Sequence, residues 1–193
     1  MILGRALNCH GVVDKKIPGI GATTLEINSK RNSIIVLPTK ALAYGKHSKH
    51  PNTLYVGSEI KGEKVTNQQI EEYLAKDGYK KLLVVADSLG RLLDIIGKNY
   101  RDYFLMIDEV DVLQTDNNFR PQLENVIDYY CMFPSKNRCM VTATMKEFSN
   151  PLLKKECKFS ITWTYNARRD VRLLHTNNIT QTVTEEIIST YTP

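Results

Sequence analysis

The chain has 193 residues, of which 42% are hydrophobic and 24% are charged, and this is the usual composition of a globular protein. The composition excludes a disordered, collagen-like or low-complexity chain, and the length favours one domain with a sizeable core. A count of 26 basic and 21 acidic residues gives a net charge of +5, which permits an anionic partner such as nucleic acid without requiring one.

The four cysteines are spaced too widely to form a CxxC pair, and a chain of this size needs no disulfides to fold. We therefore expect reduced thiols and a cytoplasmic location. The sequence contains no apolar run near the ~18 residues that cross a bilayer, and the first residues lack the apolar stretch of a signal peptide. We expect no membrane partner.

Short apolar runs rich in β-formers alternate with helical patterns, which is typical of a parallel α/β sheet. The runs predict strands at Ser33–Leu37, Thr53–Val56, Lys81–Ala86, Tyr103–Ile107, Arg138–Thr142, Phe159–Trp163 and Val171–His175. The helical patterns predict helices from Thr66, as N-cap, to about Lys76, and at Ser88–Ile96, Arg120–Tyr130 and Thr184–Tyr191. The stretch Lys40–Lys49 is expected to be a basic loop. We expect a single domain over residues 1–193 that is a fragment of a longer protein.

A glycine-containing segment, Lys16–Leu25, precedes a predicted helix. Such a loop presents successive backbone N–H groups at a helix start, an arrangement that binds anions. The phosphate-loop pattern is GxxxxGK[ST]. Gly21 and Thr23 match it, but Lys16 replaces the first glycine and Ala22 replaces the lysine. A simple turn that caps the helix is the alternative reading.

Three carboxylates follow the apolar strand at Tyr103–Ile107: Asp108, Glu109 and Asp111. Ligands of parallel sheets gather beyond the carboxyl ends of the strands. Asp108 is thus well placed to bind a metal ion, and Glu109 to polarise an attacking water. A solvated acidic turn is the alternative.

The run Val141–Met145 ends another predicted strand and places Thr142 and Thr144 on either side of an alanine. Threonine is a good strand residue, so this motif alone says little. Its meaning depends on the two motifs that precede it in the chain.

Taken in order, the three motifs resemble the first RecA-like domain of superfamily 2 helicases, the group with DEAD-box and DExH-type enzymes. Residues 18–23 resemble motif I, residues 37–43 motif Ia, residues 87–94 motif Ib, residues 108–111 motif II and residues 142–144 motif III. The resemblance covers about residues 10–175. It implies a RecA-like phosphate-loop fold, a mostly parallel sheet with helices on both faces.

The resemblance also implies ATP and Mg²⁺ as cofactors and assigns roles to single residues. Phosphates would be bound by Pro18, Gly19, Ile20, Gly21, Ala22, Thr23 and Thr24. Thr23 and Asp108 would hold Mg²⁺, Glu109 would orient the attacking water, and Asp111, Thr142 and Thr144 would couple nucleotide state to nucleic-acid binding. Thr39, Lys40, Ser88 and Arg91 would contact the backbone of DNA or RNA, which positions the protein without reading sequence.

The chain departs from the family at Ala22, because the family's lysine stabilises the β/γ oxygens in phosphoryl transfer. Three explanations stay open: a dead site, weak binding and hydrolysis, or another cation, with Lys15 and Lys16 near in sequence. The family also hydrolyses ATP between two RecA-like domains, so we expect a second domain as partner and little activity from this chain alone.

The expected function is the nucleotide-binding domain of an ATP-dependent helicase or translocase. The alternatives are a non-enzymatic scaffold that binds nucleic acid or protein and, less in keeping with residues 38–43, a different phosphate-loop ATPase.

Overall fold

The structure is a computed structural model that describes residues 10–60, 62, 64–112, 122–145, 148, 150–161 and 175–191. The chain divides into two compact units, Met1–Thr162 and Trp163–Pro193. The first contains an α/β sheet, and the second contains helix α8 (Ile179–Tyr191). A single domain over residues 1–193 therefore stays a prediction.

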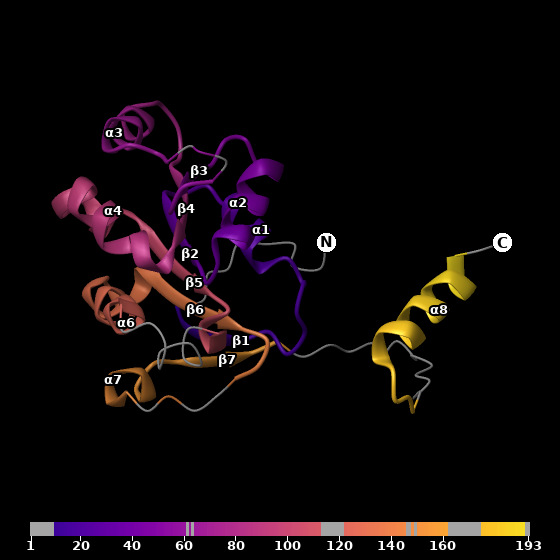
Figure 1. The fold of residues 1–193 in the computed structure, drawn as a ribbon. Helices are drawn as coiled ribbons and strands as arrows, with labels where there is room; N and C mark the ends of the chain where they lie inside the picture. Colours follow the sequence, from indigo (N-terminus) through magenta and orange to yellow (C-terminus); the bar gives the residue numbers. More distant parts are fainter. Residues whose placement is uncertain are drawn as a thin grey trace. The chain divides into compact units, whose positions relative to one another are not determined.

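The described residues of the first unit form one sheet of seven strands, all parallel, in the order β3-β4-β2-β5-β6-β1-β7 (Figure 1). The strands are β1 (Gly11–Asp14), β2 (Ser33–Leu37), β3 (Leu54–Val56), β4 (Lys81–Val85), β5 (Phe104–Asp108), β6 (Arg138–Thr142) and β7 (Lys158–Ser160). Parallel strands need crossover connections, which the helices supply. The predicted α/β class with a parallel sheet is confirmed.

Most predicted strands lie within a residue or two of the observed ones, and β2 and β6 match at both ends. Strand β1 was not predicted, because it has four residues with only Val12 and Val13 as a clear apolar pair. The predicted strand at Val171–His175 lies outside the described residues except for His175, which is not in a strand.

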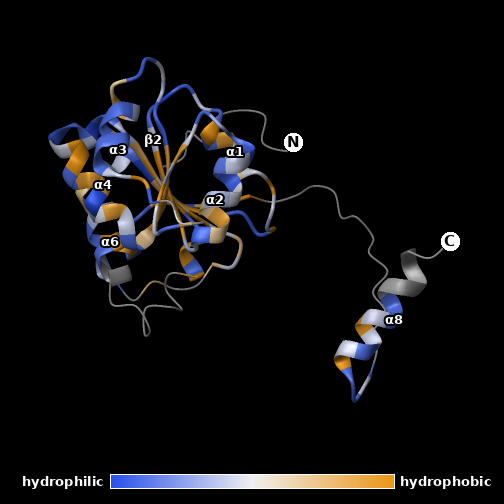
Figure 2. Ribbon diagram, turned by 45° about the horizontal axis from the view of Figure 1, so that its top comes forward, coloured by the Kyte–Doolittle hydropathy of each residue, from blue (hydrophilic) through white to orange (hydrophobic). Residues whose placement is uncertain are grey.

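Helices cover both faces of the sheet, which lies between them as a mostly hydrophobic layer (Figure 2). One face carries α1 (Ala22–Ile27) and α2 (Lys40–Lys49). The other carries α3 (Asn67–Leu74), α4 (Leu89–Ile96), α6 (Gln122–Met132) and α7 (Pro151–Lys154). The described residues of this unit also form short 3₁₀ helices at Ala86–Ser88, Gly97–Asp102 and Ser135–Asn137.

The prediction of a basic loop at Lys40–Lys49 is wrong, because these residues form helix α2. Thr39 caps the helix by accepting a hydrogen bond from the Leu42 N–H, and Lys46 and Lys49 lie in the last turn, where cations favour the helix dipole. Only Ala43 of α2 is fully buried, so the sequence lacks the apolar stripe that reveals a surface helix.

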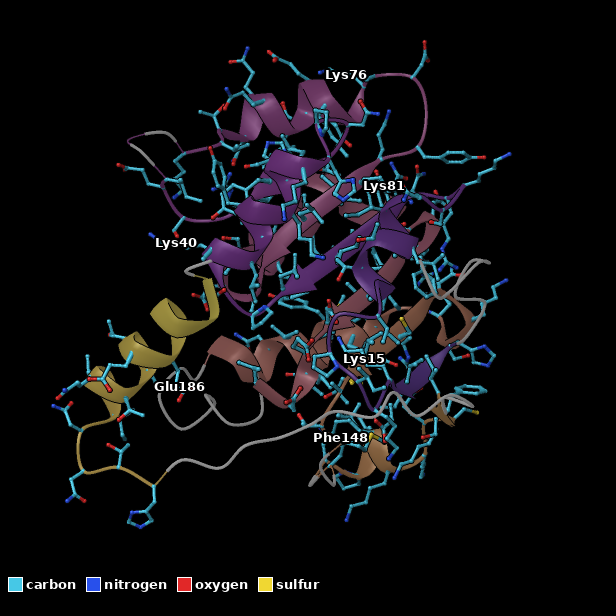
Figure 3. All side chains as sticks on the ribbon, turned by 90° about the vertical axis from the view of Figure 1, so that its right-hand side faces the viewer. Lys15, Lys40, Lys76, Lys81, Phe148 and Glu186 are labelled. Atoms are coloured by element: carbon cyan, nitrogen blue, oxygen red, sulfur yellow. The ribbon has the colours of Figure 1, made fainter. Side chains whose placement is uncertain are left out.

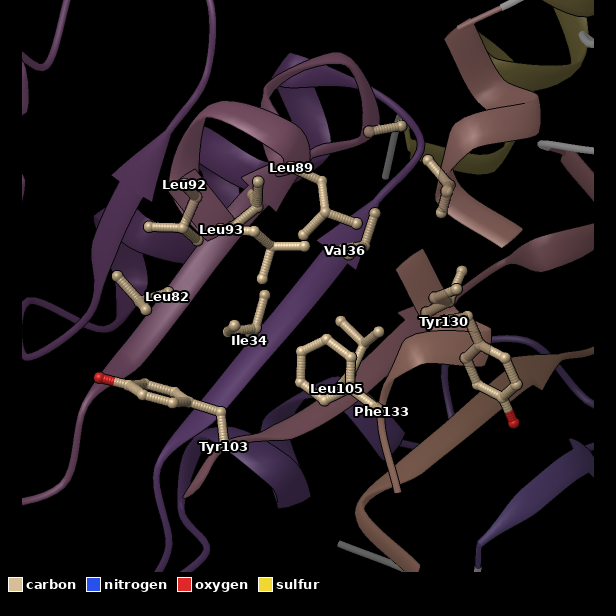
Figure 4. Packing of buried hydrophobic residues seen from close by; sticks show 14 of the residues in the cluster. Ile34, Val36, Leu82, Leu89, Leu92, Leu93, Tyr103, Leu105, Tyr130 and Phe133 are labelled. Carbon is tan, nitrogen blue, oxygen red and sulfur yellow. The ribbon is translucent and has the colours of Figure 1, made fainter. Parts of the chain in front are cut away.

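Alternation along the strands divides the core into two layers. On the face of α3, α4 and α6, Ile34, Leu82 and Leu105 of three adjacent strands pack with Leu89 and Leu92 of α4 (Figure 4). The residues next to them in sequence point to the α1 and α2 face. A rigid sheet with both faces covered therefore carries the strand ends where the predicted motifs lie.

Candidate nucleotide site

The predicted motifs meet at one edge of the sheet, because parallel strands end at the same edge. The registers pair Asp14 at the end of β1 with Thr142 at the end of β6, and Asp108 at the end of β5 with Val141. In parallel sheets this edge is where ligands bind. Residues separated by more than 90 positions in sequence are thus neighbours here.

The glycine-containing segment forms a loop between β1 and α1. Gly19 and Gly21 have φ angles of 75° and 94°, values that residues with a side chain rarely adopt. Among the described residues, no atom lies within 4 Å of a Cβ built at either glycine, so space is open beside the loop. Pro18 and Gly19 are exposed, whereas Ile20 is buried.

Gly21 is the N-cap of α1, and the first helical hydrogen bond runs from the Leu25 N–H to the Gly21 carbonyl. The N–H groups of a helix's first turn have no partner within the helix. Those of Ala22, Thr23 and Thr24 are in this first turn. The glycine-containing segment thus leads directly into a helix start, where the motif places its N–H donors.

Thr23 and Asp108 are joined by a buried hydrogen bond, in which the Thr23 hydroxyl donates to Asp108 Oδ2 over 2.5 Å. Both residues are about 5% exposed. A hydroxyl and a carboxylate are hard oxygen donors, and Mg²⁺ in proteins is typically held by one or two such groups together with substrate phosphates. The two predicted metal ligands are thus adjacent, and their donor set fits Mg²⁺.

Lys15 brings an ammonium group to the same place (labelled in Figure 3). Its Nζ lies 3.2 Å from Asp108 Oδ1 and 2.6 Å from Glu109 Oε1, and its side chain is 5% exposed. Burial by itself lowers the pKa of Lys15, but the neighbouring carboxylates of Asp108 and Glu109 outweigh it, so the net pKa is raised. The ammonium is therefore kept charged between two carboxylates.

Glu109 begins the turn after β5 with a φ of 54°, which is unusual for a residue with a side chain. Its N–H donates to Asp108 Oδ1 over 3.1 Å, and its carbonyl accepts from the Val112 N–H. Such strained residues persist where the surroundings enforce them, and they cluster at functional sites. The turn holds the Glu109 carboxylate beside Lys15.

Asp111 joins motif II to motif III. Its Oδ1 accepts a 2.6 Å hydrogen bond from the Thr142 hydroxyl, and its Oδ2 accepts one from the Thr144 hydroxyl. Thr142 is buried, and its oxygen also accepts a hydrogen bond from the Thr144 N–H. The three residues predicted to act together in coupling are therefore in direct contact.

The four residues predicted to contact nucleic acid follow two adjacent strands, β2 and β4. Thr39 and Lys40 are exposed at the start of α2, and Ser88 is half-buried at the start of α4. Arg91 is also half-buried, and its guanidinium donates to the Val65 carbonyl. Thr39 and Lys40 are thus exposed beyond the end of β2, whereas Ser88 and Arg91 are half-buried beyond the end of β4, where Arg91 is hydrogen-bonded within the protein.

His47, which the sequence places in a histidine-containing stretch, is held by a contact within the protein. The His47 ring bonds to the Thr53 hydroxyl over 3.0 Å, and burial lowers the pKa of His47. In the described part of the chain, no three His, Cys, Asp or Glu side chains come together as a metal site. None of the helices among the described residues is long and apolar enough to cross a membrane.

Sequence reasoning assigned a role to each residue of this site except Lys15. It mentioned Lys15 and Lys16 only as cations that could replace the missing loop lysine at Ala22. The sequence feature that points to Lys15 is its position directly after β1, a strand that was not predicted. Only the prediction of β1 would have shown that the first lysine continues a strand toward the site.

Comparison with known proteins identifies the family of the chain. The family model for the DEAD/DEAH box helicases matches residues 17–151, which is well over half of the chain. No curated protein matches the chain. The matched residues begin within the glycine-containing segment and include motif II, Thr142 and Thr144, so the chain belongs to the DEAD/DEAH box helicase family.

Proposed function

We propose that this chain is the nucleotide-binding domain of an ATP-dependent DNA or RNA helicase or translocase. The observation that carries the proposal is the 2.5 Å contact between Thr23 and Asp108 beside an open glycine loop. A hydroxyl and a carboxylate buried together beside the first turn of a helix suit a phosphate–Mg²⁺ complex.

In this proposal the backbone N–H groups of residues 19–24 bind the phosphates of ATP. Thr23 and Asp108 hold Mg²⁺, which neutralises charge on the phosphate oxygens when it is bound. Glu109 accepts a hydrogen bond from the attacking water and orients it. Its strained turn fixes the carboxylate in the water-facing part of the site, since Glu109 is only half-buried.

The contacts of Asp111 support a coupling role. Thr142 ends β6, Thr144 lies two residues beyond it, and Asp111 follows β5. A shift of the motif II turn upon nucleotide binding would therefore be transmitted to motif III through these hydrogen bonds. Hydrogen bonds to a carboxylate are strong enough, at about 1.5–3 kcal/mol each, to move such elements together.

Nucleic acid is proposed to bind across the ends of β2 and β4. Lys40 supplies a charge, Thr39 and Ser88 supply hydroxyls, and Arg91 joins them if it exchanges the Val65 carbonyl for a phosphate. Contacts of these types recognise the sugar–phosphate backbone and do not distinguish bases.

A second RecA-like domain is proposed to complete the hydrolytic site, so the reaction to ADP and phosphate belongs to the longer protein. A cytoplasmic location is proposed because Cys131, Cys139 and Cys157 are free thiols.

The test is a titration of fluorescent ADP, with Mg²⁺, into the wild-type chain and into Thr23→Val and Thr23→Ser variants. Losing one hydroxyl ligand is expected to weaken binding by about tenfold or more, at about 1.5–3 kcal/mol for a contact with a charged group. The serine variant keeps the hydroxyl and should bind like the wild type. Equal binding by all three proteins would overturn the role of Thr23, and a wild-type chain that binds no nucleotide would favour the scaffold.

A further inference from the structure

We propose that Lys15 supplies, from the end of β1, the positive charge that the family's loop lysine supplies from the position of Ala22. Its ammonium would contact the β- and γ-phosphates of the bound nucleotide. The inference rests on the proposed function, since it concerns the same site. It reassigns the cation to a residue outside the loop pattern and upstream of the segment that the family model matches.

The direction of the Lys15 side chain follows from strand parity. Val13 packs in the core layer on the α1 and α2 face, and Lys15, two residues later, continues on that face. Met106 packs in the same layer, so Asp108 also points to this face. Ala22 contributes to this layer as well, as the first residue of α1.

The reach of a lysine matches the distance that has to be covered. Strand β6 lies between β1 and β5, so Lys15 and Asp108 are separated by two strand spacings, or about 10 Å across the sheet. A four-carbon side chain with a terminal ammonium spans most of this gap. The observed 3.2 Å contact between Lys15 Nζ and Asp108 Oδ1 shows that it does so.

The backbone fixes Lys15 firmly at this position. Its N–H donates to the Thr142 carbonyl over 2.8 Å, which extends the pairing of β1 with β6 by one residue. Lys15 is therefore anchored next to motif III, and its side chain is enclosed at 5% exposure. A cation held on a sheet strand is better positioned than one on a mobile loop.

Lys16 cannot take the same role. Its φ of 57° turns the chain, and its Nζ pairs with Asp14 Oδ2 over 2.6 Å while its side chain remains 58% exposed. The backbone thus directs the side chain of Lys15 into the site and that of Lys16 to the surface. This makes Lys16 a matched control for Lys15.

A purely structural salt bridge is the competing explanation, since Lys15 neutralises two carboxylates in either case. The two roles predict different effects on the affinities for different nucleotides. A phosphate contact favours nucleotides that carry a β-phosphate over those that do not, whereas a structural bridge affects folding and all nucleotides alike. The affinity ratio of ADP to AMP therefore separates them.

The experiment measures Mg-ADP and Mg-AMP affinities by calorimetry for the wild type and for Lys15→Met, Lys16→Met and the double variant Lys15→Met with Ala22→Lys. Loss of a charged contact is expected to weaken Mg-ADP binding by about tenfold or more in Lys15→Met and to bring the ADP to AMP ratio toward one. Lys16→Met should behave like the wild type. The double variant, which has the family's ordinary GKT loop, should regain ADP affinity.

If Lys15→Met binds Mg-ADP with the affinity of the wild type and keeps its ADP to AMP ratio, the inference is overturned and the proposed function is left intact. Absence of binding in the wild type would overturn both. Should Lys15→Met fail to fold, Lys15→Gln takes its place, because the amide keeps a hydrogen-bond donor for the two carboxylates but carries no charge. A folded Lys15→Gln variant with an ADP to AMP ratio near one supports the inference, and one with the wild-type ratio contradicts it.

Discussion

The Thr142 hydroxyl donates a 2.6 Å hydrogen bond to Oδ1 of Asp111, which is 31 residues earlier in the chain. The bond joins the end of β6 to the turn that follows β5, and Thr142 is buried. Replacing Thr142 by valine keeps the shape and removes the donor to a charged group. We expect the free energy of unfolding in urea to fall by about 1.5–3 kcal/mol.

Thr142→Ser is the matched control, because it keeps the hydroxyl, and its unfolding midpoint should lie close to that of the wild type. The proposed coupling adds a second readout. The factor by which Mg-ADP changes the affinity for a single-stranded oligonucleotide should approach one in Thr142→Val. A Thr142→Val variant with wild-type stability and wild-type coupling would show that this hydrogen bond contributes neither to stability nor to coupling.

Gly11 and Gly45 are expected to respond to alanine in opposite directions. A Cβ at Gly11 would lie 2.3 Å from the Cys157 carbonyl oxygen, and its φ is 101°, so Gly11→Ala should destabilise the protein by about 2 kcal/mol or more. Gly45 lies inside α2, and no described atom is within 4 Å of its Cβ position. Gly45→Ala should stabilise by about 0.5–1 kcal/mol. Urea unfolding of both variants gives the signs, and equal signs would contradict this account of β1.

Lys81 is buried at the amino end of β4 (labelled in Figure 3), far from the nucleotide edge in sheet register. Its Nζ donates to the Glu26 carbonyl and to the Ser29 and Ser33 hydroxyls, over 2.8, 2.8 and 2.9 Å. Burial lowers the pKa of Lys81 to about 8, against the opposing attraction of Glu26 and with added repulsion from Arg31.

Because the folded-state pKa of Lys81 is below its unfolded value of 10.5, the unfolded chain binds more protons between these values and stability rises with pH. From pH 7.5 to 9.5 the contribution of Lys81 should increase the free energy of unfolding by about 2 kcal/mol. The measurement is the difference between wild type and Lys81→Met at the two pH values. Lys76→Met, at an exposed lysine, should show no such pH-dependent difference. A Lys81→Met variant that tracks the wild type at both pH values would contradict the shifted pKa.

Arg138 ties α6 to the amino end of β6. Its guanidinium donates to the carbonyl oxygens of Tyr130, Cys131 and Phe133, over 3.1, 2.8 and 3.1 Å, and pairs with Glu156. Arg138→Met leaves these carbonyls and a mostly buried carboxylate without their cation. We expect a loss of about 3 kcal/mol in urea unfolding.

Arg101→Met is the control for Arg138, since Arg101 is exposed and contacts the ring of Tyr100 at the surface. Its unfolding midpoint should stay at the wild-type value. Equal effects of the two substitutions would show that the Arg138 contacts add nothing to stability.

The sequence predicted those parts of the fold in which the hydrophobic residues follow a clear local pattern. β2 and β6 are five-residue runs buried along nearly their whole length, and their bounds were predicted without error. The convergence of Thr23 with Asp108, and of Asp111 with Thr142, was also predictable, because motifs at the carboxyl ends of parallel strands share one edge.

Lys15 was beyond such reasoning for a physical reason. Lys15 follows four residues that have little strand character in sequence, so the sequence does not show to which face of the sheet its side chain points. That face depends on the alternation of side chains along β1. The contact with Asp108 also depends on the position of β1 two strands from β5. Helix α2 was not predicted for a similar reason, since a helix in which only Ala43 is buried has almost no apolar periodicity in its sequence.

The most direct test of the account is a calorimetric titration of ADP into the wild-type chain, in Mg²⁺ and again in excess chelator. The account predicts saturable binding with one site per chain that weakens sharply when Mg²⁺ is removed, because Thr23 and Asp108 are the proposed ligands of the ion that would accompany the phosphates. No heat of binding at millimolar Mg-ADP, or binding indifferent to chelator, would contradict the claim that this edge of the sheet is a nucleotide site.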